Sequence, residues 1–284
     1  MIVVGFDTSQ PSLAATDWAA REAARRDLRL ELLQAWPWGP DKPLGTGQAE
    51  RWARQQLAER AEAVRAAHPG LVVVATHVED DAVDVLTAAT DRAALLVLGS
   101  RGLGPVHGFL VGSVSQRVLG RAGCPVVLVR APSGPAGEGV IMGIDLAHPC
   151  REVLAFAFET AASRGAPLTV VHAWRPPAGS EYLHFDAGGD LDPELAQAEL
   201  RGLEEAVAPW RERYPDLPCA TALLRGHAAL TVVEAAAGAE LLVVGARPRH
   251  HALGAHLGPV THAVVHHVGC PVAVVPYDPA RAAD

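Results

Sequence analysis

Short aliphatic runs alternate with amphipathic segments along the whole chain. The run from Ile2 to Phe6 is continuously apolar, as expected for a strand covered on both faces. The segment from Ser12 to Arg26 has helical periodicity, with Ser12 suited to cap its start and a basic cluster suited to the dipole at its end. The same pattern predicts strands at 28–35, 71–77, 94–98 and 125–130, and helices at 49–67, 82–92 and 113–122. This alternation predicts an α/β fold, with a parallel sheet and helices on both faces.

The second half of the chain repeats the first. V-G-F-D at 4–7 returns as M-G-I-D at 142–145, and Q-A-W at 34–36 returns as H-A-W at 172–174. L-V-L-G at 96–99 returns as L-V-V-G at 242–245, and G-C-P-V at 123–126 returns unchanged at 269–272. The offset grows by eight residues between these pairs, and we expect the insertion as a loop between Arg175 and Asp192, after which Asp192 and Pro193 start a helix.

The repeat divides a chain of 284 residues into two tandem domains. We predict a first domain at residues 1–133 and a second at 138–284, joined by a segment at 131–137 that is rich in proline and glycine.

Charge and composition exclude several classes of partner. The net charge is −8 and aromatic residues make up 5% of the chain, whereas nucleic-acid binding needs clustered cations and, for single strands, aromatic platforms. Met1 does not begin a basic and apolar leader, and charged residues interrupt the longest apolar stretch before 18 residues. We therefore expect a cytoplasmic protein with no membrane and no nucleic-acid partner. The four cysteines form no C-x-x-C pair and are expected to be free thiols.

The main candidate for chemistry is a glycine loop after the fourth expected strand. Gly99 and Gly102 are followed, after nine residues, by Gly112 and Ser113 at the start of a helix. Glycines let the backbone approach an anion, helix N-terminal amides donate to phosphate oxygens, and Ser113 and Ser115 add hydroxyl groups. The loop lies beyond the carboxyl ends of parallel strands, where open α/β sheets hold ligands. It is neither a Walker A loop nor a compact dinucleotide fingerprint, and a purely structural turn is the alternative.

Three motifs together resemble a known family. G-x2-G-x9-G-S at 99–113, V-V-G-F-D at 3–7 and C-P-V-V at 124–127 resemble the universal stress protein family in its tandem, actinobacterial form. The resemblance implies Rossmann-like domains, of the adenine nucleotide alpha hydrolase-like type, each with five parallel strands in the order 3-2-1-4-5. It implies ATP binding in many members and a role in stress adaptation without a settled reaction. It also implies self-association through the last strands, which in a tandem chain lets 125–130 pair with 271–275 as a pseudo-dimer.

The resemblance also assigns site residues by position. Asp7 would contact the ribose hydroxyls, and the backbone of Ala35 would face the adenine edge. Mg²⁺ would often accompany the triphosphate. Asp7 as a helix-capping carboxylate and Arg101 as a solvated loop cation are the alternatives. The residues expected around the phosphates are Gly99, Arg101, Gly102, Gly112, Ser113, Val114 and Ser115.

The second half departs from this pattern in its loop. Pro248 stands where the second glycine is expected, and Pro259 stands where serine is expected. Each proline removes an amide donor, and Pro259 also removes a hydroxyl. Asp145 and Thr261 remain in the places of Asp7 and Ser115. We therefore expect a degenerate nucleotide site in the second domain, and one ATP per chain.

Two further sets of residues have simple interpretations. His262 and His266 lie four residues apart on an expected helix and can share a metal ion, but a polar helix face without a metal is the simpler reading. Cys124 and Cys270 occupy equivalent places and are expected to be buried.

Three function classes follow. The first is an ATP-binding stress or regulatory protein that is not an enzyme. The second is a weak ATP-hydrolysing or adenylyl-transferring enzyme, but neither His-x-Gly-His nor Ser-Gly-Gly-x-Asp-Ser occurs in the chain. The third is a scaffold or dimerisation protein of the same fold that binds no nucleotide.

Overall fold

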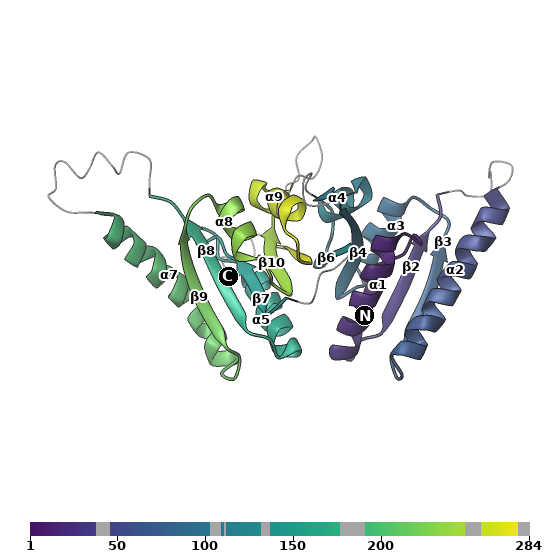
Figure 1. Ribbon diagram of the computed structural model, residues 1–284, viewed down its shortest axis with the longest axis horizontal. Helices are drawn as coiled ribbons and strands as arrows, with labels where there is room; N and C mark the ends of the chain where they lie inside the picture. The colour runs from purple at the N-terminus through teal and green to yellow at the C-terminus, as the bar shows by residue number, and fades with distance from the viewer. Residues whose placement is uncertain are drawn as a thin grey trace.

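The computed structural model describes residues 1–37, 46–102, 109–110, 112–131, 137–176, 191–247 and 257–277. Two similar lobes lie side by side, and a single sheet runs through both (Figure 1). The segments that carry the expected linker and most of the expected insertion, 132–136 and 177–190, lie outside the described residues.

The first lobe alternates strands and helices as its sequence predicts. Its elements are β1 (Ile2–Gly5), α1 (Gln10–Arg25), β2 (Leu30–Ala35), α2 (Thr46–Ala67), β3 (Val73–Val78), α3 (Ala82–Ala89), β4 (Leu95–Gly102), β5 (Phe109–Leu110), α4 (Ser113–Leu119) and β6 (Val126–Ala131). The sequence predicts the end of β4 at Leu98, but the strand continues to Gly102 because β6 pairs with it as far as Arg101 and β5 pairs with its last two residues.

The second lobe repeats this order. Its elements are β7 (Val140–Gly143), α5 (Arg151–Arg164), β8 (Leu168–Trp174), α7 (Leu191–Arg213), β9 (Cys219–Arg225), α8 (Ala228–Ala235), β10 (Leu241–Ala246), α9 (Pro259–His267) and β11 (Val272–Pro276). No helix of the described segments is both long and apolar enough to span a bilayer.

The strands form one sheet with the order β3-β2-β1-β4-β6-β11-β10-β7-β8-β9, and β5 pairs with β4 outside this path. Each lobe thus has the predicted order 3-2-1-4-5 with parallel pairing. The lobes join where β6 and β11 pair antiparallel, with Val272 opposite Leu128 and Val274 opposite Val126. The last strands therefore pair within the chain, as the pseudo-dimer prediction requires.

Helix starts differ from the sequence prediction at three places, and the first is α2, which begins at Thr46 rather than at Ala49. Ser9 caps α1, accepting from the Ser12 amide, whereas the Ser12 hydroxyl donates to the Ser9 carbonyl. Ser12 as the cap is therefore wrong, because Pro11 suits the first turn and the helix begins earlier. The second helix of the second lobe begins at Leu191, so Asp192 is not its cap.

Strand residues alternate between two apolar layers. Ile2 and Val4 point toward the layer under α1 and α2, whereas Val3 points toward the layer under α3 and α4. The apolar face that the sequence predicts for α2 is fully buried, and its residues are Ala53, Leu57, Ala61 and Val64. Both apolar layers continue into the second lobe, so the two lobes share each layer.

Buried charges join the lobes between α1 and α5. The Glu22 carboxylate has no solvent exposure; it accepts from Arg26 of its own lobe at 2.6 Å and from Arg164 of the other lobe at 2.7 Å. Arg26 also donates to Thr160 Oγ1 at 2.9 Å. Burial lowers the pKa of Arg164, and the nearby Glu22 and Glu240 partly offset this change. Arg26 and Arg164 occupy equivalent positions, so this contact follows an approximate two-fold axis.

Candidate functional site

The strand registers bring three of the predicted site residues to one edge of the sheet. Gly5 lies opposite Leu33, and Val4 lies opposite Val97, so β1 ends beside Leu33 of β2 and close to Gly99 of β4, and both neighbouring strands continue beyond it. Asp7 follows β1, Ala35 ends β2, and Gly99 lies in the second half of β4, beside the point where β1 ends. This is the edge of an open α/β sheet where ligands generally bind.

Asp7 is held by the turn that starts α1. Its Oδ1 accepts from the amide of Ser9 at 3.0 Å and from the Ser9 hydroxyl. Thr8 between them has a φ of 66°, in the left-handed region. Asp7 is exposed and is not itself the cap of α1, because Ser9 has that role. Its carboxylate is therefore oriented by the backbone and open to solvent.

Gly99 has a packing role. A Cβ at this position would lie 2.4 Å from the Pro11 carbonyl carbon and 2.7 Å from the Ser12 amide nitrogen. Only glycine lets the first turn of α1 cross β4 this closely. Gly112, by contrast, would place a Cβ in open space and caps α4 without a side-chain hydrogen bond. Gly112 thus leaves the start of α4 accessible.

The start of α4 presents both exposed and buried groups. Ser113 and Val114 are exposed, whereas Ser115 is buried beneath them. Gly102 lies opposite Phe109 in the pairing of β4 with β5. The side chain of Arg101 and residues 103–108 and 111, which complete the predicted loop, lie outside the described residues.

Ser100 is a residue of this edge that sequence reasoning missed. It lies on β4 between Gly99 and Arg101, has no solvent exposure, and its Oγ is buried with no hydrogen-bond partner among the described residues. A buried hydroxyl without a partner is costly, which suits a position beside a binding site. The sequence signal is one serine at the end of an aliphatic strand, where the second lobe has Ala246.

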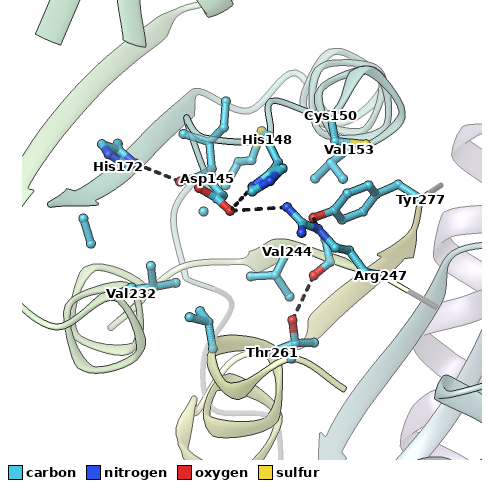
Figure 2. A pocket seen from close by; sticks show the side chains of 18 of the residues that line it. Asp145, His148, Cys150, Val153, His172, Val232, Val244, Arg247, Thr261 and Tyr277 are labelled. Carbon is cyan, nitrogen blue, oxygen red and sulfur yellow. Dashed lines mark hydrogen bonds and ion pairs between the residues drawn. The ribbon is translucent and has the colours of Figure 1, made fainter. Parts of the chain in front are cut away.

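At the equivalent edge of the second lobe, the described residues line a cavity of about 400 Å³ (Figure 2). It lies between the ends of β7, β8 and β10 and the start of α9. Its walls combine aliphatic and polar side chains, and the residues include Met142, Ile144, Asp145, His148, Cys150, Val153, His172, Val232, Val244, Gly245, Arg247, Gly258, Pro259, Thr261 and Tyr277.

The polar groups of this cavity already contact one another. Asp145 Oδ2 lies 3.2 Å from His148 Nδ1 and 3.8 Å from Arg247 Nη2, and Arg247 Nε donates to the Tyr277 hydroxyl at 2.8 Å (Figure 2). The Tyr277 ring packs so close to Gly245 that a Cβ there would lie 2.7 Å from its Cε1. The acidic and basic groups therefore largely neutralise each other.

The loop of this cavity also differs from that of the first lobe. Pro259 is the first residue of α9, where it fits the helix but offers no amide. The Thr261 hydroxyl donates to the Gly245 carbonyl at 2.8 Å. Pro248, the other proline of the predicted degenerate loop, lies outside the described residues.

The remaining candidates lie away from this edge. His262 and His266 contact each other on α9, with ring centroids 4.6 Å apart, and His266 Nε2 lies 3.2 Å from Gln116 of the first lobe. Cys124 and Cys270 are buried as predicted, and burial raises the pKa of each thiol to about 11.

The sequence profile of the Universal stress protein family matches residues 1–130 and 138–276. The chain belongs to the universal stress protein family. A universal stress protein of Mycobacterium tuberculosis strain H37Rv is 33% identical over 287 residues, which cover 96% of each chain. A universal stress protein of Mycolicibacterium smegmatis is 31% identical over 293 residues, with the same coverage. These relatives span both lobes.

The fold has a solved counterpart in the family. The crystal structure of a universal stress protein from Archaeoglobus fulgidus superposes with a TM-score of 0.74 over 97% of both chains, at 18% identity. The likeness therefore covers the tandem arrangement as well as the single lobe. Universal stress proteins are generally stress-response proteins without enzymatic activity.

Proposed function

We propose that this universal stress protein binds ATP at the edge of its first lobe and acts in the cytoplasm as a nucleotide-responsive regulator without catalysing a reaction. One observation carries the proposal. The ends of β1, β2 and β4 gather an oriented, exposed carboxylate at Asp7 and a close-packed glycine at Gly99, and the same lobe has an open helix start at Gly112.

The adenosine part of ATP would lie over the ends of β1 and β2. Asp7 offers a carboxylate oxygen to the ribose hydroxyls, which are hydrogen-bond donors. The Phe6 amide donates to the Leu33 carbonyl. Backbone groups alternate in direction along a strand, so the Ala35 carbonyl points to the same side as that of Leu33, where β1 has ended. This carbonyl is a suitable acceptor for the adenine amino group.

The phosphates would lie at the start of α4. Helix N-terminal amides attract anions, and the exposed Ser113 adds a hydroxyl donor beside the open Gly112. Val114 and Ser115 contribute their amides, and Arg101 and Gly102 lie on the adjoining end of β4. Mg²⁺ would be held mainly by phosphate oxygens and water, so it requires few protein ligands.

The second lobe is expected to bind ATP more weakly. Pro259 supplies no amide at the start of α9, and Thr261 already donates to the Gly245 carbonyl. Asp145, the counterpart of Asp7, lies in contact with His148 and Arg247. We therefore propose one high-affinity ATP site per chain.

The reciprocal exchange of Ser113 and Pro259 tests this proposal. Ser113→Pro gives α4 the proline of α9, which the first helical position tolerates. It is expected to lower ATP affinity at least about tenfold, measured by isothermal titration calorimetry, because a charge-assisted hydrogen bond contributes about 1.5–3 kcal/mol. Pro259→Ser is the matched control and should leave the high-affinity site unchanged.

Two results would contradict the proposal. ATP affinity that survives Ser113→Pro but disappears with Asp145→Ala would put the ligand in the second lobe. Sustained, multiple turnover of ATP by the purified chain would show an enzyme. The nucleotide released when freshly purified protein is denatured gives an independent check, because it requires no assumption about the ligand.

A further inference from the structure

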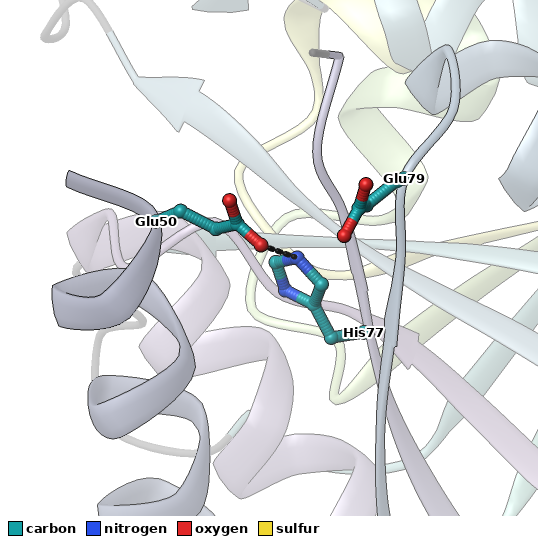
Figure 3. Close-up of side chains that lie close together, drawn as sticks. All are labelled: Glu50, His77 and Glu79. Atoms are coloured by element: carbon teal, nitrogen blue, oxygen red, sulfur yellow. Dashed lines mark ion pairs between the residues drawn. The ribbon is translucent and has the colours of Figure 1, made fainter. Parts of the chain in front are cut away.

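Three side chains that ligate metals converge in the first lobe, away from the glycine loop. Glu50 comes from the beginning of α2, His77 from the end of β3, and Glu79 follows that strand directly. One oxygen or nitrogen atom of each lies within 4.8 Å of the others. Figure 3 shows the His77 ring between the two carboxylates, with its Nε2 3.8 Å from Glu50 Oε1. Glu50 is buried, whereas Glu79 is exposed, so the group is open on one side.

The His77 ring is fixed in the orientation that a metal ligand needs. Gln34 Nε2 donates to the Ala53 carbonyl at 3.2 Å, which assigns the amide nitrogen and leaves Gln34 Oε1 to face His77. His77 Nδ1 lies 2.8 Å from this oxygen and must therefore donate to it. In the neutral ring, Nε2 then has the lone pair, directed toward Glu50. Metal-binding histidines usually have a second contact of this kind, which sets the tautomer.

The negative charges of the two carboxylates and the lone pair of His77 Nε2 favour a bound cation. Arg54 supplies one, because its Nη2 donates to Glu50 Oε1 at 2.8 Å and to Glu79 Oε1 at 2.9 Å. The Arg54 side chain is 45% exposed, so it can turn into solvent, although it then loses its three hydrogen bonds to the two carboxylates. A divalent ion bonded to three ligand atoms would replace the charge of Arg54 and would also coordinate the nitrogen lone pair.

The second lobe lacks this group although it has the same fold. Gln34 lies opposite His77 in the β2–β3 register, and His172, the counterpart of Gln34, lies opposite Leu223. By the same register, Arg225 occupies the place of Glu79. Leucine offers no atom that binds a metal, and the positive charge of arginine repels a cation at this place. The fold itself therefore does not require the three side chains, which are particular to the first lobe.

We propose that Glu50, His77 and Glu79 form a binding site for a divalent transition metal of the Zn²⁺ type. One imidazole and two carboxylates suit Zn²⁺ or Co²⁺, whereas Mg²⁺ and Ca²⁺ prefer oxygen ligands alone. Three protein ligands leave a fourth, solvent-facing position beside Glu79. The bound metal ties the beginning of α2 to the end of β3. None of these three ligands belongs to the proposed ATP site, although Gln34, which orients His77, is next to Ala35.

Titration of the full chain with Zn²⁺, and with Co²⁺ as a coloured substitute, tests the site. We expect one ion bound at this site, with the Glu79→Gln affinity lower by about tenfold or more, since even outer partners of a metal site contribute about 10–100-fold. Arg54→Gln is expected to raise the affinity, because it removes the competing cation. Glu59→Gln on the same helix, where Glu59 contacts Gln55 and Gln56, is the matched control and should have no effect.

A local optical signal identifies which metal site is occupied. The Trp36 ring centroid lies 6.2 Å from that of His77, so Co²⁺ bound here should quench Trp36 fluorescence, and Trp36→Phe should remove that component. Co²⁺ binding with equal affinity in the unchanged chain and in Glu79→Gln would overturn the proposal. So would binding that is lost with His262→Ala and retained in Glu79→Gln, which would place the metal on α9. The absence of any 1:1 binding would also overturn it.

Discussion

Replacing Glu22 by glutamine should reveal how strongly the two lobes are coupled. The change keeps the size of the side chain but removes a charge that has no solvent exposure. Arg164, whose side chain is 2% exposed, then loses one of its two carboxylate partners, and Arg26 loses its charged partner on the same helix. Removing one member of a buried ion pair costs about 3–5 kcal/mol.

The lower end of that range applies here. Arg164 still pairs with Glu240, which is 23% exposed, and the new amide oxygen can still accept one hydrogen bond. We therefore expect Glu22→Gln to lower the free energy of unfolding by about 3 kcal/mol. Urea denaturation, followed by circular dichroism and by tryptophan fluorescence, measures this difference. Because Glu22 joins the lobes, the two signals should also separate, as the lobes begin to unfold independently.

A surface pair provides the matched control. Glu62 pairs with Arg65 on α2 and is 73% exposed, so Glu62→Gln should change stability by less than about 1 kcal/mol. Adding Arg164→Met to Glu22→Gln should restore part of the loss, because the buried cation is then also removed. A loss below about 1 kcal/mol in Glu22→Gln, equal to that of the control, would refute the reasoning that this carboxylate holds the lobes together.

Two other groups give predictions from their pKa values. Burial alone would raise the pKa of Glu31, but the hydrogen bonds and charge of Arg92 lower it below its ordinary value, so this pair stabilises the fold above that value. Its contribution should disappear as the pH falls through the lowered pKa, and Arg92→Ala should flatten the acid limb of a stability-against-pH curve. Because burial raises the pKa of Cys124 and Cys270 to about 11, both should react with Ellman's reagent at pH 8 only in denaturant; fast reaction in native buffer of a chain with Cys150→Ala and Cys219→Ala would contradict this.

The regular elements could be predicted because each has a local cause. Continuous aliphatic runs such as Ile2 to Phe6 form strands covered on both faces, and the spacing of Ala53 and Leu57 fixes the buried face of α2. The cap of α1 was missed because Ser9 and Ser12 both have capping side chains, and the choice depends on Pro11 in the first turn. The continuation of β4 was missed because it depends on pairing with β6 and β5.

The candidate site could be located from the sequence, but the roles of its residues could not. The glycine loop and Asp7 follow strands whose carboxyl ends share one edge, and a parallel topology is enough to predict that. The clash of a Gly99 Cβ with Pro11 depends on how α1 crosses β4, and local spacing does not show it. Glu22 has the pattern of an ordinary helix-surface residue, because the partner that covers it comes from the other lobe.

The antiparallel pairing of β6 with β11 makes one polypeptide serve as both members of a pair. In a dimer of identical chains, every substitution appears on both sides of the symmetry axis. Here a substitution appears on one side only, so Glu22 has Thr160 as its counterpart, and His77 has Leu223. A single mutation can therefore alter one lobe while the other lobe stays unchanged. Because both lobes belong to one chain, each can acquire its own binding residues while the interface between them is kept.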